Sequence, residues 1–238
     1  MENTITKNTI KEAIQSVLDK SMVKGTRRCT SFEFCYNCFR SQEHQKDQER
    51  ACTILCFYLV NWGGRSPFIL EETNLKVYLP IIDYISQLDK ETWDIDADNY
   101  DEKNIEKIIE IYKQLEQCFK KQKYNPTKTL ITKIMLGVFG NVCVFDTYFC
   151  ETFKKLYKDH KELKCSFTTF NKTALLCIKD FYKNHKEIID GVKIETIAFD
   201  GDEATYPYPK ARLIDMFGFQ YGITHSQKQK PSQIKCPF

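Results

Sequence analysis

The sequence has little of what an all-β protein requires, and it lacks a long apolar segment. Only 9 glycines and 7 prolines occur in 238 residues, too few for the many tight turns of an all-β fold. The longest apolar run, 51–60, is too short to cross a membrane, and the polar N-terminus has no signal-peptide pattern. We therefore expect a cytoplasmic protein with no membrane partner, whose 11 cysteines stay reduced.

Motifs for cofactors and for common nucleophiles are also missing. No Walker loop, dinucleotide fingerprint or GxSxG elbow occurs, and the four histidines have no metal-binding spacing. Cys35 and Cys38 could share a zinc ion with Cys29 and His44, but no second CxxC pair exists and aromatic residues surround these cysteines. An iron–sulfur cluster is excluded because the C-terminal tail has only Cys236. We predict neither a metal nor a cofactor.

The chain as a whole has no large excess of positive or negative charge, since its net charge is only +3. Lysines are nevertheless concentrated in one stretch of fourteen residues, which holds Lys120, Lys121, Lys123, Lys128 and Lys133. Such a cluster is either a solvated helix face or a site for phosphate groups.

Apolar residues recur at helical spacing along most of the chain, which predicts a mainly α, all-helical fold. The expected helices are 6–20, 31–42, 47–61, 77–88, 104–119, 127–139, a helix starting at 147, 166–183 and 210–219. The acidic segment 89–102 is expected to be an exposed loop, and 193–199 allows at most one short strand. Residues 1–225 then form one globular domain, and 226–238 form a mobile tail.

The chain is organised around residues 125–153. The dipeptide Asn125-Pro126 indicates a turn, and a strongly apolar helix follows it. A short apolar connector, 142–145, leads to Asp146, which directly precedes the next helix. An aspartate in this position is commonly a helix N-cap, so Asp146 has a structural interpretation beside any catalytic one.

In this stretch Lys128-Thr129 is followed, 18 positions after Lys128, by Asp146 in Phe145-Asp146-Thr147. This arrangement resembles the helix-hairpin-helix DNA glycosylases of the endonuclease III superfamily. Tyr124-Asn125-Pro126 stands where that family has Gly-x-Gly. The resemblance implies a helical bundle with two lobes around a cleft, about 1–100 plus the C-terminal helices and 101–165. It also implies that Asp146 is the catalytic carboxylate and that Lys128 stands at the position of the amine nucleophile in lyase-competent members.

The resemblance leads us to expect a monomeric glycosylase that hydrolyses the N-glycosidic bond of a modified base flipped out of double-stranded DNA. In this interpretation Asp146 stabilises the sugar cation and orients water. The base-binding candidates are Trp62, Arg65 and Tyr148, and the candidates for contact with the DNA backbone are Lys123, Thr127, Lys128, Thr129 and Lys133. Trp62 is equally well interpreted as a residue that covers the core from its loop.

Lys128 has two possible roles, as an amine nucleophile or as a phosphate contact, and we favour a monofunctional enzyme with Lys128 on phosphate. Two further stretches, CFYLVNWGGRSPFIL and YPKARLIDMFGFQ, are similar to uncharacterised bacterial proteins. A glycosylase would serve DNA repair or defence against phage, and only the phage setting rests on that similarity. The alternative class is a non-catalytic helical module that binds nucleic acid or protein through the same lysines.

Overall fold

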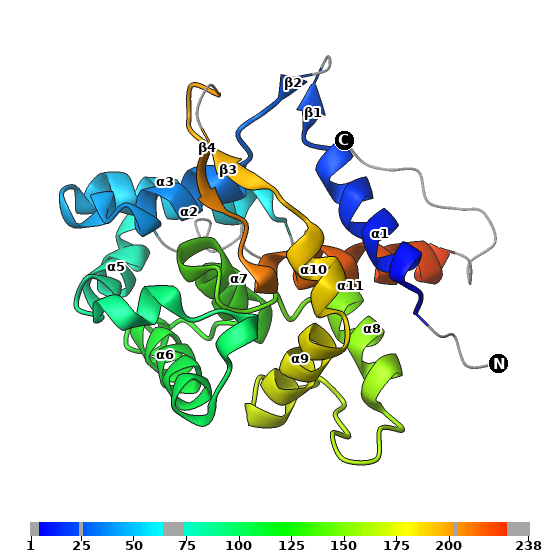
Figure 1. The fold of residues 1–238 in the computed structure, drawn as a ribbon. Coiled ribbons are helices and arrows are strands. Elements are labelled where there is room, and N and C mark those ends of the chain that lie inside the picture. Colours follow the sequence, from blue (N-terminus) through cyan, green and yellow to red (C-terminus); the bar gives the residue numbers. More distant parts are fainter. Residues whose placement is uncertain (1–4, 24–25, 64–73, 202–203, 228–238) are drawn as a thin grey trace.

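The protein is mainly helical, as the sequence pattern predicts (Figure 1). The structure is a computed structural model that describes residues 5–23, 26–63, 74–201 and 204–227. The helices in this part of the chain are α1 (Lys7–Asp19), α2 (Ser31–Arg40), α3 (Gln48–Asn61), α5 (Leu79–Ser86), α6 (Glu102–Lys120), α7 (Lys128–Phe139), α8 (Thr147–Tyr157), α9 (Lys172–Asn184), α10 (Lys186–Gly191) and α11 (Lys210–Gln227). Short 3-10 helices connect them at η1 (Glu43–Gln45), η2 (Leu75–Tyr78), η3 (Lys90–Asp94) and η4 (Ala97–Asn99).

In the described part of the chain, four short strands form two antiparallel hairpins. The expectation of at most one short strand, at 193–199, was therefore wrong. The strands β1 (Met22–Val23) and β2 (Thr26–Arg27) form one hairpin. The strands β3 (Glu195–Ile197) and β4 (Ala204–Pro207) form the other, and only β3 falls in the predicted segment 193–199. Asn37 of α2 holds the second hairpin through its side-chain amide, which donates to the Ile197 carbonyl at 3.0 Å.

Three predicted elements differ from the structure. The helix predicted over 166–183 begins only at Lys172, because the side chain of Asn171 caps its first turn. The segment 89–102 was expected to be exposed, but it forms η3 and η4 and buries Trp93, Ile95 and Tyr100. Its polar residue Asp96 accepts the backbone amides of Lys210 and Ala211 at 2.7 and 2.8 Å, and so caps the start of α11. Helix α11 continues to Gln227, beyond the predicted start of the mobile tail, and 228–238 lie outside the described residues.

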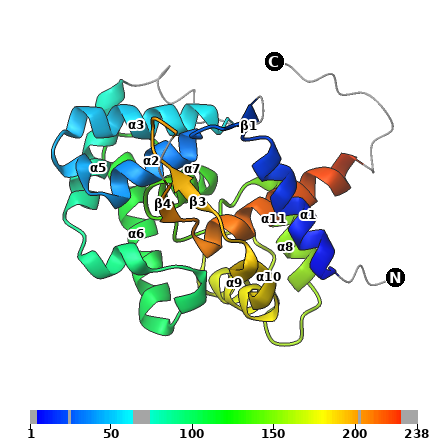
Figure 2. The ribbon, with the colours of Figure 1, turned by 45° about the horizontal axis from the view of Figure 1, so that its top comes forward.

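Helix α7 lies at the centre of the fold. Ten of its residues, 130–139, are buried, and it packs against α2, α3 and α6 (Figures 1 and 2). Gly137 allows close approach to α3, because a Cβ there would lie 2.3 Å from the Tyr58 ring. The helix ends at Gly140, which has φ of 70° and leaves no space for a side chain beside Pro209. The chain therefore turns sharply from α7 into the connector that precedes Asp146.

The buried apolar residues form one cluster that extends from α1 to α11. The helices in the described ranges therefore contribute to a shared core. None of the helices in the described ranges is both long and apolar enough to cross a membrane.

Candidate active site

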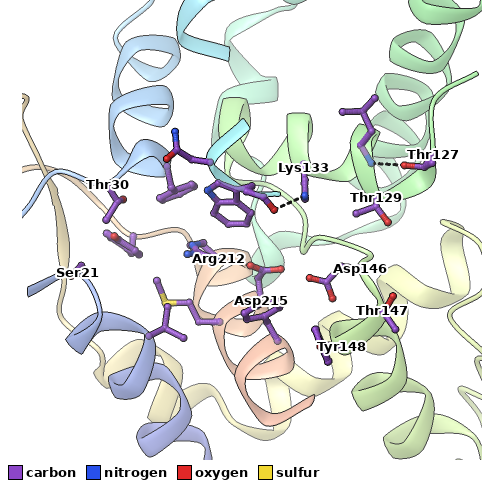
Figure 3. Close-up of a pocket in the computed structure, with 18 of the residues that line it drawn as sticks. Ser21, Thr30, Thr127, Thr129, Lys133, Asp146, Thr147, Tyr148, Arg212 and Asp215 are labelled. Carbon is purple, nitrogen blue, oxygen red and sulfur yellow. Dashed lines mark hydrogen bonds and ion pairs between the residues drawn. The ribbon is translucent and has the colours of Figure 1, made fainter. Parts of the chain in front are cut away.

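A cavity of about 630 Å³ lies where α1, α2, α3, α7, α8 and α11 meet (Figure 3). Six of the residues predicted from the sequence line it together, namely Trp62, Thr127, Thr129, Lys133, Asp146 and Tyr148. Residues that the sequence did not single out complete the wall, notably Ser21, Thr30, Phe32, Tyr208, Arg212 and Asp215. Lys123 and Lys128 do not line the cavity, and Arg65 lies outside the described residues.

Asp146 lies at one side of this cavity, where hydrogen bonds of its own side chain and of the preceding residue fix its position. As predicted, it is the N-cap of α8, and its carboxylate accepts the amide of Phe149 at 2.8 Å. The preceding residue, Phe145, is bonded to α7 twice: its amide donates to the Thr132 hydroxyl at 3.0 Å, and its carbonyl accepts from the Thr129 hydroxyl at 2.9 Å. These bonds fix the direction in which the Asp146 carboxylate points.

A second aspartate, Asp215 of α11, reaches the same cavity and is only 2% exposed. Its carboxylate accepts the Val144 amide at 2.8 Å and a guanidinium N–H of Arg212 at 2.6 Å. The Arg212 guanidinium in turn lies over the rings of Phe32 and Trp62, at 5.0 and 4.6 Å from their centroids. Asp215 therefore joins the connector before Asp146 to the C-terminal helix.

Lys133 brings a second cation to the cavity. It is 5% exposed, and its amine donates to the carbonyls of Trp62 and Gly63 at 2.7 and 2.8 Å, at the C-terminal end of α3. A cation is favourable there because the helix dipole is negative at that end. Lys133 is thus buried and stabilises the end of α3 at Trp62. The prediction that Lys133 contacts a DNA phosphate required an exposed amine, which this position does not provide.

The charges in the cavity shift the pKa of its ionisable groups. Burial raises the pKa of Asp146 to about 6, and the nearby charge of Asp215 adds to this effect, while the Phe149 amide and Lys133 oppose it. Burial also raises the pKa of Asp215, against the influence of Arg212 and the Val144 amide. Burial lowers the pKa of Lys133, although both aspartates favour its cation. At neutral pH Asp146 is therefore mainly a carboxylate that can also exchange a proton.

Two aromatic residues predicted to bind a base lie on different parts of the wall. Trp62 is packed between Arg212 and Tyr58, whose ring centroid is 5.0 Å away, so its indole is firmly positioned. Tyr148 is 38% exposed, beside Asp146 at the start of α8, and its ring meets Phe219 at 5.6 Å. The cavity therefore has a fixed aromatic surface inside and a more accessible one at its rim.

The amine of Lys128 points away from this cavity. It donates to the carbonyls of Phe167 and Thr168 at 2.8 and 3.0 Å, and it lies 3.6 Å from the Cys150 sulfur. These bonds connect the start of α7 to the segment that precedes α9. In this conformation Lys128 reaches neither the space beside Asp146 nor a free surface position.

The turn between α6 and α7 has the hydrogen bonds of a Schellman motif. The Tyr124 amide donates to the Phe119 carbonyl at 3.1 Å, and the Lys123 amide donates to the Lys120 carbonyl at 2.9 Å. Lys123 has φ of 63°, a left-handed conformation that glycine adopts most easily. This is the turn where the resembled family has its glycines.

Replacing Lys123 with glycine is expected to leave the free energy of unfolding unchanged or to raise it by up to about 1 kcal/mol, because the left-handed strain is relieved. The matched change Lys121→Gly should instead lower it by about 1 kcal/mol, because Lys121 has a helical φ of −59°. Urea denaturation of both variants measures the difference. Equal destabilisation by the two changes would contradict the assigned turn.

Arg212 and Asp215 have a sequence signal that neither composition nor a known motif reveals. They stand three positions apart in an otherwise apolar segment, with Leu213, Ile214 and Met216 between and after them, and those three are buried. Opposite charges at this spacing on a buried helix indicate a paired interior site. No sequence pattern, however, shows that this pair lies beside Asp146.

The cysteines considered for zinc lie in the core. Cys35 and Cys38 are buried, and burial raises the pKa of both thiols, that of Cys38 to about 11. Within the described ranges no group of three or more histidine, cysteine, aspartate or glutamate side chains is arranged to hold a metal ion. The thiols pack as small apolar groups.

Comparison of the chain with protein-family models, with curated proteins and with solved structures finds no match.

Proposed function

We propose that the protein is a DNA glycosylase of the helix-hairpin-helix type, which hydrolyses the N-glycosidic bond of a modified base turned out of double-stranded DNA. The observation that carries the proposal is the placement of Asp146, a rigidly held carboxylate at the side of a cavity large enough for a base, with aromatic residues Trp62 and Tyr148 on its wall. DNA repair and defence against phage are the two settings that this activity would serve.

The chemistry follows from the charges around the cavity. When the bond breaks, the electron pair leaves with the base and the sugar gains cationic character. The Asp146 carboxylate can stabilise that cation and accept a proton from the attacking water. Lys133 and Arg212 lie on the same wall, where their positive charges can stabilise the negative charge on the departing base.

The direct test is mass spectrometry of bases released by the purified protein from duplexes that each contain a different modified base. Release of a free base, together with alkali-labile abasic sites, is the expected result. A non-catalytic binding module would bind DNA with an affinity that falls steeply with salt, and it would release no base from any duplex. That result would replace the glycosylase proposal with the second class.

The rate of base release is expected to fall as the pH is lowered through about 6. Asp146 acts as a carboxylate, and its raised pKa means that protonation removes its charge at this pH rather than near pH 4. Single-turnover rates between about pH 5 and pH 8 measure this dependence, with unfolding followed in parallel. A rate that stays constant down to pH 5 would exclude a carboxylate with this pKa as the essential base.

A further inference from the structure

The cavity is larger than an unmodified base requires. Ligand pockets of roughly 300–1,000 Å³ hold drug-sized molecules, so a cavity of this size has room for more than a nucleobase. Because a flipped base enters with its sugar at the catalytic carboxylate, the part of the cavity away from that carboxylate is left for a further group.

The remaining volume lies away from Asp146. Figure 3 shows Asp146 and Thr147 at one end of the cavity and Ser21 and Thr30 at the other, with Asp215 and Arg212 between them. The far end is formed by the C-terminal end of α1 and the start of α2. A base attached at the Asp146 end would therefore extend past Arg212 toward Ser21 and Thr30.

The polar groups at the far end match hydroxyl groups. The Ser21 hydroxyl donates to the Leu18 carbonyl at 2.6 Å, so its oxygen remains an acceptor. The Thr30 hydroxyl oxygen accepts the Glu33 amide at 3.3 Å, so its hydrogen remains available for donation. A ligand hydroxyl is both donor and acceptor, and it can use both groups.

The middle of the cavity adds a further donor. The Arg212 side chain is only 11% exposed, and its Nε is buried without a hydrogen-bond partner. The rings of Phe32 and Trp62 both contact its guanidinium, at 5.0 and 4.6 Å from their centroids. A polar ligand atom in the cavity could accept a hydrogen bond from this donor.

We propose that the substrate is a base that carries a bulky, hydroxyl-rich substituent, such as a sugar, with the substituent at the Ser21 and Thr30 end. This inference rests on the proposed function for the position of the base. It names the class of modified base that the enzyme excises.

The test uses three otherwise identical duplexes, which contain one cytosine, one 5-hydroxymethylcytosine, or one 5-hydroxymethylcytosine with glucose on its hydroxyl. Binding is measured with the Asp146→Asn protein by fluorescence anisotropy, and base release is measured with the wild-type protein. We expect the glucose-carrying duplex to bind at least about tenfold more tightly than the other two, since several hydrogen bonds and additional buried area are gained. Equal binding of the three duplexes would overturn the inference.

A variant that fills the far end provides a second measurement. Ser21→Leu is expected to reduce the tenfold preference for the glucose-carrying duplex to nearly one. The matched change Ser166→Leu, at an exposed serine that does not line the cavity, should leave the preference intact. Retained preference in Ser21→Leu would show that the substituent does not lie between α1 and α2.

The outcomes also separate this inference from the proposed function. Tight, glucose-dependent binding without release of any base would support the substrate class and contradict the glycosylase activity. Release of bases from all modified duplexes at similar rates would support the activity and overturn the substrate class.

Discussion

Replacing Asp146 with asparagine is expected to lower the rate of base release at least about a hundredfold without unfolding the protein. Asparagine is as good an N-cap as aspartate, and its side-chain oxygen can still accept the Phe149 amide at the start of α8. The change therefore removes the negative charge and the proton acceptor but keeps the local structure. Single-turnover rates of base release measure the loss, and thermal denaturation checks the fold.

Asp101→Asn is the matched control for this change. Asp101 is the N-cap of α6, its carboxylate accepts the Asn104 amide at 2.7 Å, and it does not line the cavity. The same chemical change there should leave base release at the wild-type rate. Full activity of Asp146→Asn would refute the proposed role of Asp146, and loss of activity in both variants would indicate a general effect on folding.

Removing the positive charge of Arg212 is expected to lower the free energy of unfolding by about 3 to 5 kcal/mol at neutral pH. In Arg212→Met, the Asp215 carboxylate remains buried and loses the guanidinium that it accepts from at 2.6 Å. Urea denaturation measures this loss. The double variant Arg212→Met, Asp215→Asn should recover most of it, because asparagine carries no charge and still accepts the Val144 amide.

The pH dependence of this loss separates charge from packing. Without Arg212, the pKa of Asp215 in the folded state rises further above its unfolded value. A carboxyl group whose pKa is raised in the folded state adds to the free energy of unfolding at low pH. This contribution disappears as the pH rises through the pKa of the folded state. The deficit of Arg212→Met should therefore shrink between about pH 8 and pH 5. A deficit of the same size at both pH values would assign it to lost packing on Phe32 and Trp62.

The sequence predicted the elements of this protein well wherever local interactions decide them. Asp146 caps α8, as its position before the helix indicated, because an N-cap depends on residues within one helical turn. The segment 89–102 was assigned wrongly for the opposite reason. Its acidic residue Asp96 is used by the distant start of α11, and this contact brings Trp93 and Tyr100 into the core.

Only part of the candidate site was predicted, because contacts between distant segments of the chain also form this site. Asp146, Trp62 and Tyr148 line one cavity, and their roles in binding and catalysis stay predictions. The sequence did not place Asp215 and Arg212 beside them, since these residues come from α11, about seventy positions further along the chain. Two lysines of α7, Lys128 and Lys133, were both expected to contact DNA phosphates, with the role of amine nucleophile as the alternative for Lys128. In the structure Lys133 lines the cavity, and Lys128 is bonded to the segment before α9.

The sequence by itself determined the helical class, the order of the helices and the position of an aspartate at a helix N-terminus, because apolar periodicity and capping act over a few residues. Only the tertiary structure decided which charges meet in the cavity and how large it is. Those properties depend on the packing of α1 and α2 with α7, α8 and α11, which come from three distant parts of the chain (Figure 2). Burial in that packing, and not the residue type, raises the pKa of Asp146 to about 6.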